Sequence, residues 1–334
     1  EYRGYDSAGI AVIGADGVIK RRRAQGKIAN LRRELDAAPA GGACGIAHTR
    51  WATHGKPSEA NAHPHQSGPV AIVHNGIIEN FQELRRELEG RGHVFESQTD
   101  SEVIAHLITD GLNGGQDMTA AFAAALPRLR GAYAIAAVNE AEPGRIWAAR
   151  EGSPLVVGLG EGECFVGSDA IALADWTRRV IYLEEGDWCV VDGAGPEIRD
   201  QAGRPAQRAE QISHAVPGMA DKGEYRHFME KEIHEQPDAI GRTLSRYIDV
   251  AQSCFAVETG FDWMEVDRLL LTACGTAYYA GAVARYWFES LARLPVEADI
   301  ASEFRYREPV VSPRDAALFI SQSGETADTL AALR

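Results

Sequence analysis

The chain has 334 residues, of which 45% are hydrophobic and 25% are charged, and its formal net charge is −14. This length allows two domains, each with its own core. The acidic balance argues against a nucleic-acid-binding surface, which usually needs a basic face, and no apolar run approaches the ~20 residues of a membrane span.

The first part of the chain has the pattern of an α+β domain. Apolar runs at residues 10–13 and 18–20 flank Asp16 and Gly17, which predicts a β-hairpin. Helical spacing of apolar residues predicts three helices, near residues 28–35, 81–88 and 103–108. We expect Asn80 to cap the second helix with its side chain, with Glu83 three residues further on.

Short strands are predicted throughout residues 132–191, where apolar runs alternate with Gly-rich turns. Only residues 170–176 suggest a helical interruption. Strands joined by tight turns are typical of antiparallel sheets, here flanked by helices. We therefore expect a first domain over residues 1–194.

The pattern changes after residue 194. Residues 195–222 are polar and rich in Gly and Pro, which predicts a linker, and residues 223–259 predict a helical connector that is interrupted near Pro237. Within residues 260–334, two stretches have the order strand, glycine turn, helix, and a further strand lies between them. This alternation predicts a parallel sheet, so the second domain is of the α/β class.

The chain begins with Glu1 inside a motif-like stretch and stops at Arg334 inside an apparent helix, so we expect a piece of a longer protein. Its five cysteines show no paired spacing. An odd number of unpaired cysteines is typical of a reducing compartment, and we expect a cytoplasmic protein.

Polar side chains gather where predicted strands end, between His48 and Asn80. Burying them costs free energy unless each finds a partner, so the pattern indicates a site for a small polar ligand. Arg50 has the forked guanidinium that grips a carboxylate with two bonds, and Asp100 is suited to hold an ammonium group. Together they would bind the zwitterionic end of an amino acid.

Asn75 and Gly76 provide an amide side chain and an unhindered backbone N–H, which are the parts of an oxyanion hole. Trp51 and His54 lie in the same loop as Arg50 and are candidates to close over the ligand.

Simpler explanations exist for each of these residues. An arginine near a strand end often forms an ion pair, and Asn-Gly is usually a turn. The histidines at positions 48, 63 and 65 are explained either as packed core residues or, with His54 and His74, as a metal site, although their spacings match no zinc pattern.

A second site is predicted where the two strand–turn–helix stretches turn into their helices. Small hydroxyl residues and glycine at such a point form a cradle of N–H groups for a phosphate. The candidates are Cys274, Gly275, Thr276, Ser321, Gln322, Ser323 and Thr326.

The motifs YRGYDSAG, GIAHTRWATHG, NAHPH, HNGIIEN and SQTDSE occur in the order and spacing of the class II glutamine amidotransferases, which the first 190 residues resemble. The resemblance implies antiparallel sheets sandwiched by helices, of the N-terminal-nucleophile type. It also implies that Arg50 binds the glutamine α-carboxylate and Asp100 its α-amino group, that Asn75 and Gly76 form the oxyanion hole, and that Trp51 and His54 lie in a closing loop.

In that family the nucleophile is an N-terminal cysteine in a Cys-Gly-Ile motif, which we expect upstream of Glu1. Its free α-amine, with an ordinary pKa near ~8, is the general base. Cys44 begins an internal Cys-Gly-Ile but has no free amine beside it, so we expect a packed strand cysteine.

The second half resembles the sugar isomerase (SIS) domains, which bind phosphosugars, and its cradle residues match positions that contact the sugar phosphate. Ala277 stands where many relatives have serine, which removes one hydroxyl donor. The segments YRHFMEKEIHEQP and ASEFRYR are further signatures of one enzyme family that combines both domains.

This combination implies a homodimeric enzyme that hydrolyses L-glutamine, passes the ammonia to the SIS half, and converts fructose 6-phosphate to glucosamine 6-phosphate without metal, flavin or nicotinamide. A second SIS domain follows in relatives and brings the isomerase residues. The alternatives are another class II amidotransferase and a non-enzymatic phosphosugar-binding regulator.

Overall fold

The computed structural model describes residues 6–50, 55–213, 215, 223, 225–249, 254–255, 262–322, 324 and 326–334. The chain forms two compact units, Glu1–His234 and Glu235–Arg334. The first unit thus ends inside the segment that the sequence assigns to the helical connector. Within the described part of the chain, no helix is both long enough and apolar enough to span a bilayer.

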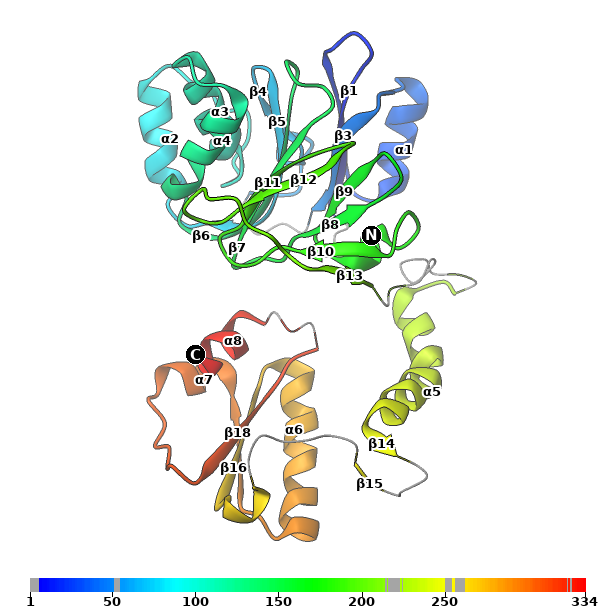
Figure 1. The fold of residues 1–334 in the computed structure, drawn as a ribbon, viewed down its shortest axis with the longest axis vertical. Helices are drawn as coiled ribbons and strands as arrows, with labels where there is room; N and C mark the ends of the chain where they lie inside the picture. The colour runs from blue at the N-terminus through cyan, green and yellow to red at the C-terminus, as the bar shows by residue number, and fades with distance from the viewer. Residues whose placement is uncertain are drawn as a thin grey trace. The chain divides into compact units, whose positions relative to one another are not determined.

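A six-stranded antiparallel sheet is the centre of the first unit, with the strand order β12-β11-β7-β6-β5-β4 (Figure 1). Its strands are β4 (His65–Ser67), β5 (Val70–Ile78), β6 (Gly131–Asn139), β7 (Ile146–Glu151), β11 (Trp188–Asp192) and β12 (Gly195–Arg199).

Two smaller antiparallel sheets pack on one face of this sheet. The first has the order β2-β1-β3 and contains the predicted hairpin around Gly17, and the second has the order β13-β10-β8-β9. Their strands are β1 (Ser7–Ile13), β2 (Ile19–Gln25), β3 (Cys44–Arg50), β8 (Val156–Leu159), β9 (Cys164–Gly167), β10 (Arg179–Tyr182) and β13 (Glu210–Ile212). Ile46 and Ala71 meet in the core beneath the first of these sheets, and Val157 and Cys189 meet beneath the second.

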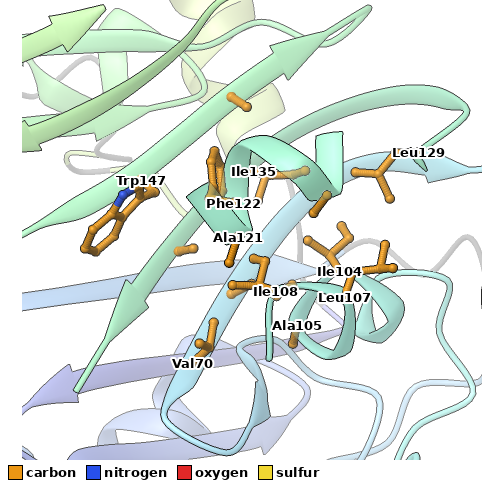
Figure 2. Close-up of a cluster of buried hydrophobic side chains, with 14 of the residues drawn as sticks. Val70, Ile104, Ala105, Leu107, Ile108, Ala121, Phe122, Leu129, Ile135 and Trp147 are labelled. Atoms are coloured by element: carbon orange, nitrogen blue, oxygen red, sulfur yellow. The ribbon is translucent and has the colours of Figure 1, made fainter. Parts of the chain in front are cut away.

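Three helices cover the opposite face of the six-stranded sheet, where they bury the largest core of the unit (Figures 1 and 2). Ile104 and Ile108 of α3 and Phe122 of α4 pack there against Val70 and Ile135 of the sheet. The helices of the first unit are α1 (Ile28–Ala37), which packs against β1 and β2, α2 (Phe81–Gly90), α3 (Glu102–Asn113) and α4 (Met118–Ala125), with short turns at η1 (Leu126–Arg128) and η2 (Ala170–Leu173).

Strand β5 contributes to both cores, because successive residues of a strand point to opposite faces. Val70, Ile72 and Ile78 belong to the core under the helices, whereas Ala71 and Val73 pack toward β1 and β3. The same strand carries Asn75 and Gly76. The antiparallel sheets flanked by helices confirm the expected fold class of this unit.

The predicted linker at residues 195–222 is wrong for its first part. Residues 195–199 form β12 on the edge of the large sheet, and residues 210–212 form β13 beside β10. The buried carboxylate of Asp187 accepts bonds from Arg208 Nε and Nη2, both at 2.8 Å, which ties this polar segment to the body of the unit. Pairing of β12 with β11, burial of Ile198 in the core and the Arg208–Asp187 ion pair together order the segment.

Two local predictions about helices are also wrong. Asn80 occupies the N-cap position of α2, but its side chain donates to Arg128 O and accepts from Arg130 N, so it ties the helix start to the entrance of β6. Helix α5 (Phe228–Tyr247) runs through Pro237 without a break. A proline removes one helical hydrogen bond, and the turns on both sides keep this helix continuous.

The second unit contains a three-stranded parallel sheet with the order β17-β16-β18, as the sequence predicts. Helix α6 packs on one face, where Leu269 and Leu271 meet Ala284 and Phe288, while Phe304 of α7 contacts Phe319 of β18. The elements are β14 (Ile248–Asp249), β15 (Cys254–Phe255), η3 (Trp263–Glu265), β16 (Arg268–Ala273), α6 (Gly275–Trp287), η4 (Phe288–Ala292), β17 (Val296–Ile300), α7 (Ala301–Tyr306), β18 (Asp315–Ile320) and α8 (Ala327–Leu333).

Candidate functional site

Arg50 lies at the end of β3, opposite Ser7 of β1, and is only 4% exposed. Its Nη2 donates to Gly55 O at 3.0 Å, and its Nη1 lies 3.8 Å from Asp6 Oδ1. Burial lowers the pKa of Arg50, while the negative charges of Asp6 and Asp100 act in the opposite direction. The guanidinium is therefore a buried positive charge between two carboxylates.

Asp100 lies in the turn before α3 and is 3% exposed. Its Oδ2 accepts a 2.7 Å hydrogen bond from the backbone N–H of Ile78 on β5. This bond ties the turn to the strand that carries Asn75 and Gly76. One carboxylate oxygen is thus fixed by the protein, and the negative charge of Asp100 acts to raise the pKa of Arg50.

Asn75 and Gly76 are opposite Ala134 and Tyr133 in the register of β5 and β6. The side chain of Asn75 is exposed, unlike those of Arg50 and Asp100. Gly76 has a φ of 139°, and a Cβ atom built on it would lie 2.0 Å from Ala132 O. Only glycine fits this backbone. The strand therefore presents the Asn75 side-chain amide next to the Gly76 peptide group, which no side chain covers.

Strand β3, which ends at Arg50, packs against β5, which carries Asn75 and Gly76, and the Ile78–Asp100 bond ties Asp100 to the same strand. These are four of the six candidates for the glutamine site. Trp51 and His54, the other two, lie outside the described residues.

The histidines near this site are buried, closely packed rings, although His48 Nδ1 and His74 Nε2 have no hydrogen-bond partner among the described residues. The imidazole of His63 stacks on that of His48 with centroids 4.4 Å apart and meets His65 edge-on at 4.6 Å, and the backbone N–H of His74 donates to His63 Nδ1. Desolvation lowers the pKa of His48 and His74 to about 4 and that of His63 well below its ordinary value. Among the residues that the structure describes, no group of three or more His, Cys, Asp or Glu has the arrangement of a metal site.

Cys44 begins β3, pairs with Ile13 and packs beside the core under β1. Its thiol lies 3.7 Å from Arg145 O, and burial raises its pKa. This is a packed strand cysteine kept as the neutral thiol, as the sequence predicts.

The second candidate site lies at the carboxyl edge of the parallel sheet. Ala273 and Ile320 are partners in the register of β16 and β18, so Cys274 and Ser321 follow at the same level. Cys274 is the N-cap of α6, and Gly275 opens the helix with a φ of 56°, in the left-handed region that favours glycine. Thr276 is exposed at this helix start.

Hydroxyl groups organise the turn after β18. Ser321 Oγ lies 3.0 Å from Thr326 Oγ1 and accepts a hydrogen bond from Gly324 N at 3.0 Å. Gln322 is exposed, and Ser323 lies outside the described residues. The structure thus places six of the seven predicted phosphate-cradle residues at one edge of the sheet.

Sequence reasoning missed two acidic residues of the first site. Asp6 belongs to the YRGYDSAG motif, but nothing in that stretch indicates that it pairs with Arg50 44 positions later. Glu102, in the first turn of α3, accepts hydrogen bonds from the loop that carries Asp100. Its place in SQTDSE, two residues after Asp100, is the only sequence signal for that role.

Comparison with known families agrees with this division. Residues 48–175 match the glutamine amidotransferase domain, and residues 264–334 match the SIS domain. The chain therefore carries a glutamine amidotransferase domain followed by an SIS domain.

The similarity extends over the whole chain to proteins that unite the two domains. The chain is 56% identical over 335 aligned positions to the glutamine–fructose-6-phosphate aminotransferase [isomerizing] of Gluconobacter oxydans, and 54% identical to that of Rhizobium meliloti. Each alignment covers 100% of this chain and 55% of the relative. The chain thus spans about half the length of these curated relatives.

Among solved structures, the glutamine phosphoribosylpyrophosphate amidotransferase of B. subtilis is similar with a TM-score of 0.52 and 22% identity, covering 96% of this chain and 64% of that one. At this identity the likeness concerns the fold alone.

Proposed function

We propose that the complete protein containing this chain is a glutamine–fructose-6-phosphate aminotransferase. Glutamine is hydrolysed in the first domain, and the ammonia is passed to the SIS half, which aminates and isomerises fructose 6-phosphate to glucosamine 6-phosphate. The observation that carries the proposal is the meeting of Arg50, Asp100 and the Asn75–Gly76 peptide at adjoining strand ends, in a chain that also has an SIS domain.

Charge complementarity supports the glutamine end of this proposal. Arg50 would take the α-carboxylate with its guanidinium fork, and the Asp100 oxygen that is not bonded to Ile78 N would take the α-ammonium group. Glutamine would then lie with its side-chain amide toward Asn75 and Gly76. Trp51 and His54 stay candidates for a loop that closes over it.

The chemistry at the amide requires a nucleophile and an oxyanion hole. We expect the nucleophile to be an N-terminal cysteine thiolate outside residues 1–334, with its own α-amine moving the proton. The Asn75 amide and the Gly76 N–H would donate to the oxygen that becomes negative in the tetrahedral intermediate. Cys44 is packed in β3 and its thiol is kept neutral. It therefore provides neither a thiolate nor an adjacent free α-amine.

The phosphate of fructose 6-phosphate would bind at the edge formed by the ends of β16 and β18. Neutral N–H and hydroxyl donors at a helix start suit a phosphate, because they hold its charge without burying a counter-ion. The proposed contacts are Cys274, Gly275, Thr276, Ser321, Gln322, Ser323 and Thr326. A homodimer in the cytoplasm completes the proposal.

The test is to supply the complete protein with glutamine and fructose 6-phosphate and to measure both products. We expect glutamate and glucosamine 6-phosphate in equal amounts, with no added metal or cofactor. Glutamate without an aminated sugar would indicate another class II amidotransferase. Binding of the sugar phosphate without release of glutamate would indicate a phosphosugar-binding regulator.

A further inference from the structure

The loop at residues 96–101, which carries Asp100 into the first site, is held by hydrogen bonds to groups deep in the unit. Asn61 Oδ1 accepts from Gln98 N at 2.9 Å, and Ser101 Oγ lies 2.8 Å from His74 Nδ1. With the Ile78–Asp100 bond, these contacts tie the loop to β5 and to the 61–65 segment. A loop that sets the direction of a binding carboxylate is thus anchored on the buried side.

Glu102 is the centre of this anchoring. Its side chain is buried, with an exposure of 2%, although it is a carboxylate in the first turn of a helix. Oε1 accepts from Glu96 N at 2.8 Å, and Oε2 accepts from Ser97 N at 2.7 Å and from Ser97 Oγ at 2.6 Å. One carboxylate therefore closes the loop onto the start of α3 with three short bonds.

The contacts continue from Ser97 through the loop to the histidine cluster. Ser97 Oγ lies 2.9 Å from Thr99 Oγ1, which lies 3.0 Å from His65 Nε2. Ser97, Thr99 and His65 are all buried. Thr99, the residue before Asp100, is thus held by Ser97 on one side and by His65 on the other.

Glu102 remains ionised in this setting. Burial alone would raise its pKa, but the adjacent His106 and hydrogen bonds from Ser97 and from the backbone N–H groups of residues 96 and 97 lower the pKa to about 2. His106 Nε2 lies 3.5 Å from Oε1. An ionised carboxylate accepts all three loop bonds at once, which a neutral amide of the same size does not.

We infer that Glu102 is a positioning residue for ammonium recognition: it holds the 96–101 loop so that Asp100 faces the α-amino group of glutamine. In this role Glu102 acts through the loop, by way of its bonds to residues 96 and 97. This inference rests on the proposed function, because it assumes an amino-acid ligand between Arg50 and Asp100. Its distinctive consequence is that loss of Glu102 weakens the amine contact and leaves the carboxylate contact intact.

The test compares two competitive inhibitors of glutamine hydrolysis by the complete protein: L-glutamate and glutarate, which is glutamate without its amino group. In Glu102→Gln the amide NH2 opposes one of the loop N–H donors and removes one of the three bonds. Since one such bond corresponds to roughly a tenfold change, we expect KI for glutamate to rise about tenfold and KI for glutarate to change less than about twofold. The kcat/KM for glutamine should fall with the glutamate affinity.

Two further variants complete the test. Asp187→Asn alters another buried carboxylate of the unit, 1% exposed and bonded to Arg208, and should change neither inhibition constant. Ser97→Ala removes three hydrogen bonds of the loop and should shift the glutamate constant in the same direction as Glu102→Gln. This variant keeps the test decisive if Glu102→Gln does not fold. Equal weakening of both inhibitors would overturn the inference. A wild-type protein that does not hydrolyse glutamine would overturn the proposed function instead.

Discussion

Arg50 Nη1 and Asp6 Oδ1 lie 3.8 Å apart at the joined ends of β3 and β1, with side chains only 5% and 13% exposed. Their backbones are also linked, because Asp6 N donates to Arg50 O at 3.2 Å. A guanidinium this deeply buried is strongly destabilising unless charge and hydrogen bonds compensate it. The pairing places the fork of Arg50 before any ligand arrives.

Replacement of Arg50 by alanine should separate the two half-reactions of the complete protein. We expect kcat/KM for glutamine-dependent synthesis to fall about 100-fold, the order of a lost charge-assisted contact, while synthesis from added ammonia is largely kept. Arg145→Ala, at a surface pair with Glu142, is the matched control and should change neither rate. Equal loss of both activities in Arg50→Ala would refute a glutamine-specific role.

Gly76→Ala should abolish glutamine hydrolysis and destabilise the first unit. The methyl group would approach Ala132 O to 2.0 Å, so β5 and β6 must separate at the proposed oxyanion hole. Gly195→Ala is the control, since Gly195 has a similar φ of 132° but nothing within 4 Å of the added atom. Thermal unfolding should show a clearly larger drop in Tm for Gly76→Ala. A similar drop in both variants would mean that backbone strain, and not the clash with Ala132 O, causes the loss of stability.

Two of the ion pairs of the 195–213 segment, Arg208–Asp187 and Arg179–Glu210, should differ greatly in their effect on stability. Arg208→Ala leaves Asp187 buried without its charged partner, and we expect a loss of about 3 kcal/mol in the free energy of unfolding. Arg179→Ala removes a bidentate bond to Glu210 that solvent already screens, so little change is expected. Denaturant titrations of both variants measure the difference, and comparable losses would contradict this assignment.

The buried histidines predict that stability falls in mild acid. In the folded protein the pKa of His74 is lowered to about 4 by desolvation, whereas the unfolded side chain titrates near 6.5. Between these values the unfolded chain binds more protons, so the free energy of unfolding decreases as the pH drops from 6.5 toward 4, by up to about 1.4 kcal/mol per pH unit for each such histidine. His65, whose pKa desolvation also lowers, adds to the effect.

Denaturant midpoints at pH 7, 6, 5 and 4.5 check this expectation. His65→Gln, which keeps a nitrogen near Thr99 Oγ1 but does not titrate, should show a shallower pH dependence than the wild type. His227→Gln changes an exposed histidine and should follow the wild-type curve. Identical slopes in all three proteins would show that the buried rings do not cause the acid sensitivity.

Ala277→Ser should strengthen the binding of fructose 6-phosphate by the complete protein. A hydroxyl in the first turn of α6 adds one neutral donor beside Thr276, and we expect a roughly fivefold decrease in KM, in line with about 1 kcal/mol for a neutral hydrogen bond. Ala280→Ser, at an exposed position further along α6, is the control and should leave KM unchanged.

The sequence predicts many of the strands and helices of both units, because their apolar periodicity is strong and their turns contain glycine. It misses helices α4 and α7, which are short. It also fails where a side chain has a distant partner. Asn80 bonds to residues 128 and 130, and Arg208 of the 195–213 segment bonds to Asp187. Such contacts leave no local pattern, since the partners are brought together only by the sheet order.

The candidate glutamine site could be predicted from motif spacing as a set of residue types. Its geometry could not, because the neighbourhood of Arg50 and Asp100 depends on the pairing of β3 with β1 and on the Ile78–Asp100 bond. The roles of Asp6 and Glu102 were missed for the same reason. Acidic residues are common on the surface of this chain, and the contacts of Asp6 with Arg50 and of Glu102 with the 96–97 backbone appear only in the fold.

Strand β5 restricts how this sequence can vary by insertion or deletion. Val70 and Ile72 fill one core, Ala71 and Val73 the other, and Asn75 follows directly on the same strand. Removal of one residue within β5 before Asn75 would either turn the Asn75 amide to the opposite face or exchange the two apolar sets that precede it. Length changes should therefore be confined to the loops between strands, while β5 keeps its residue count wherever the catalytic arrangement is retained.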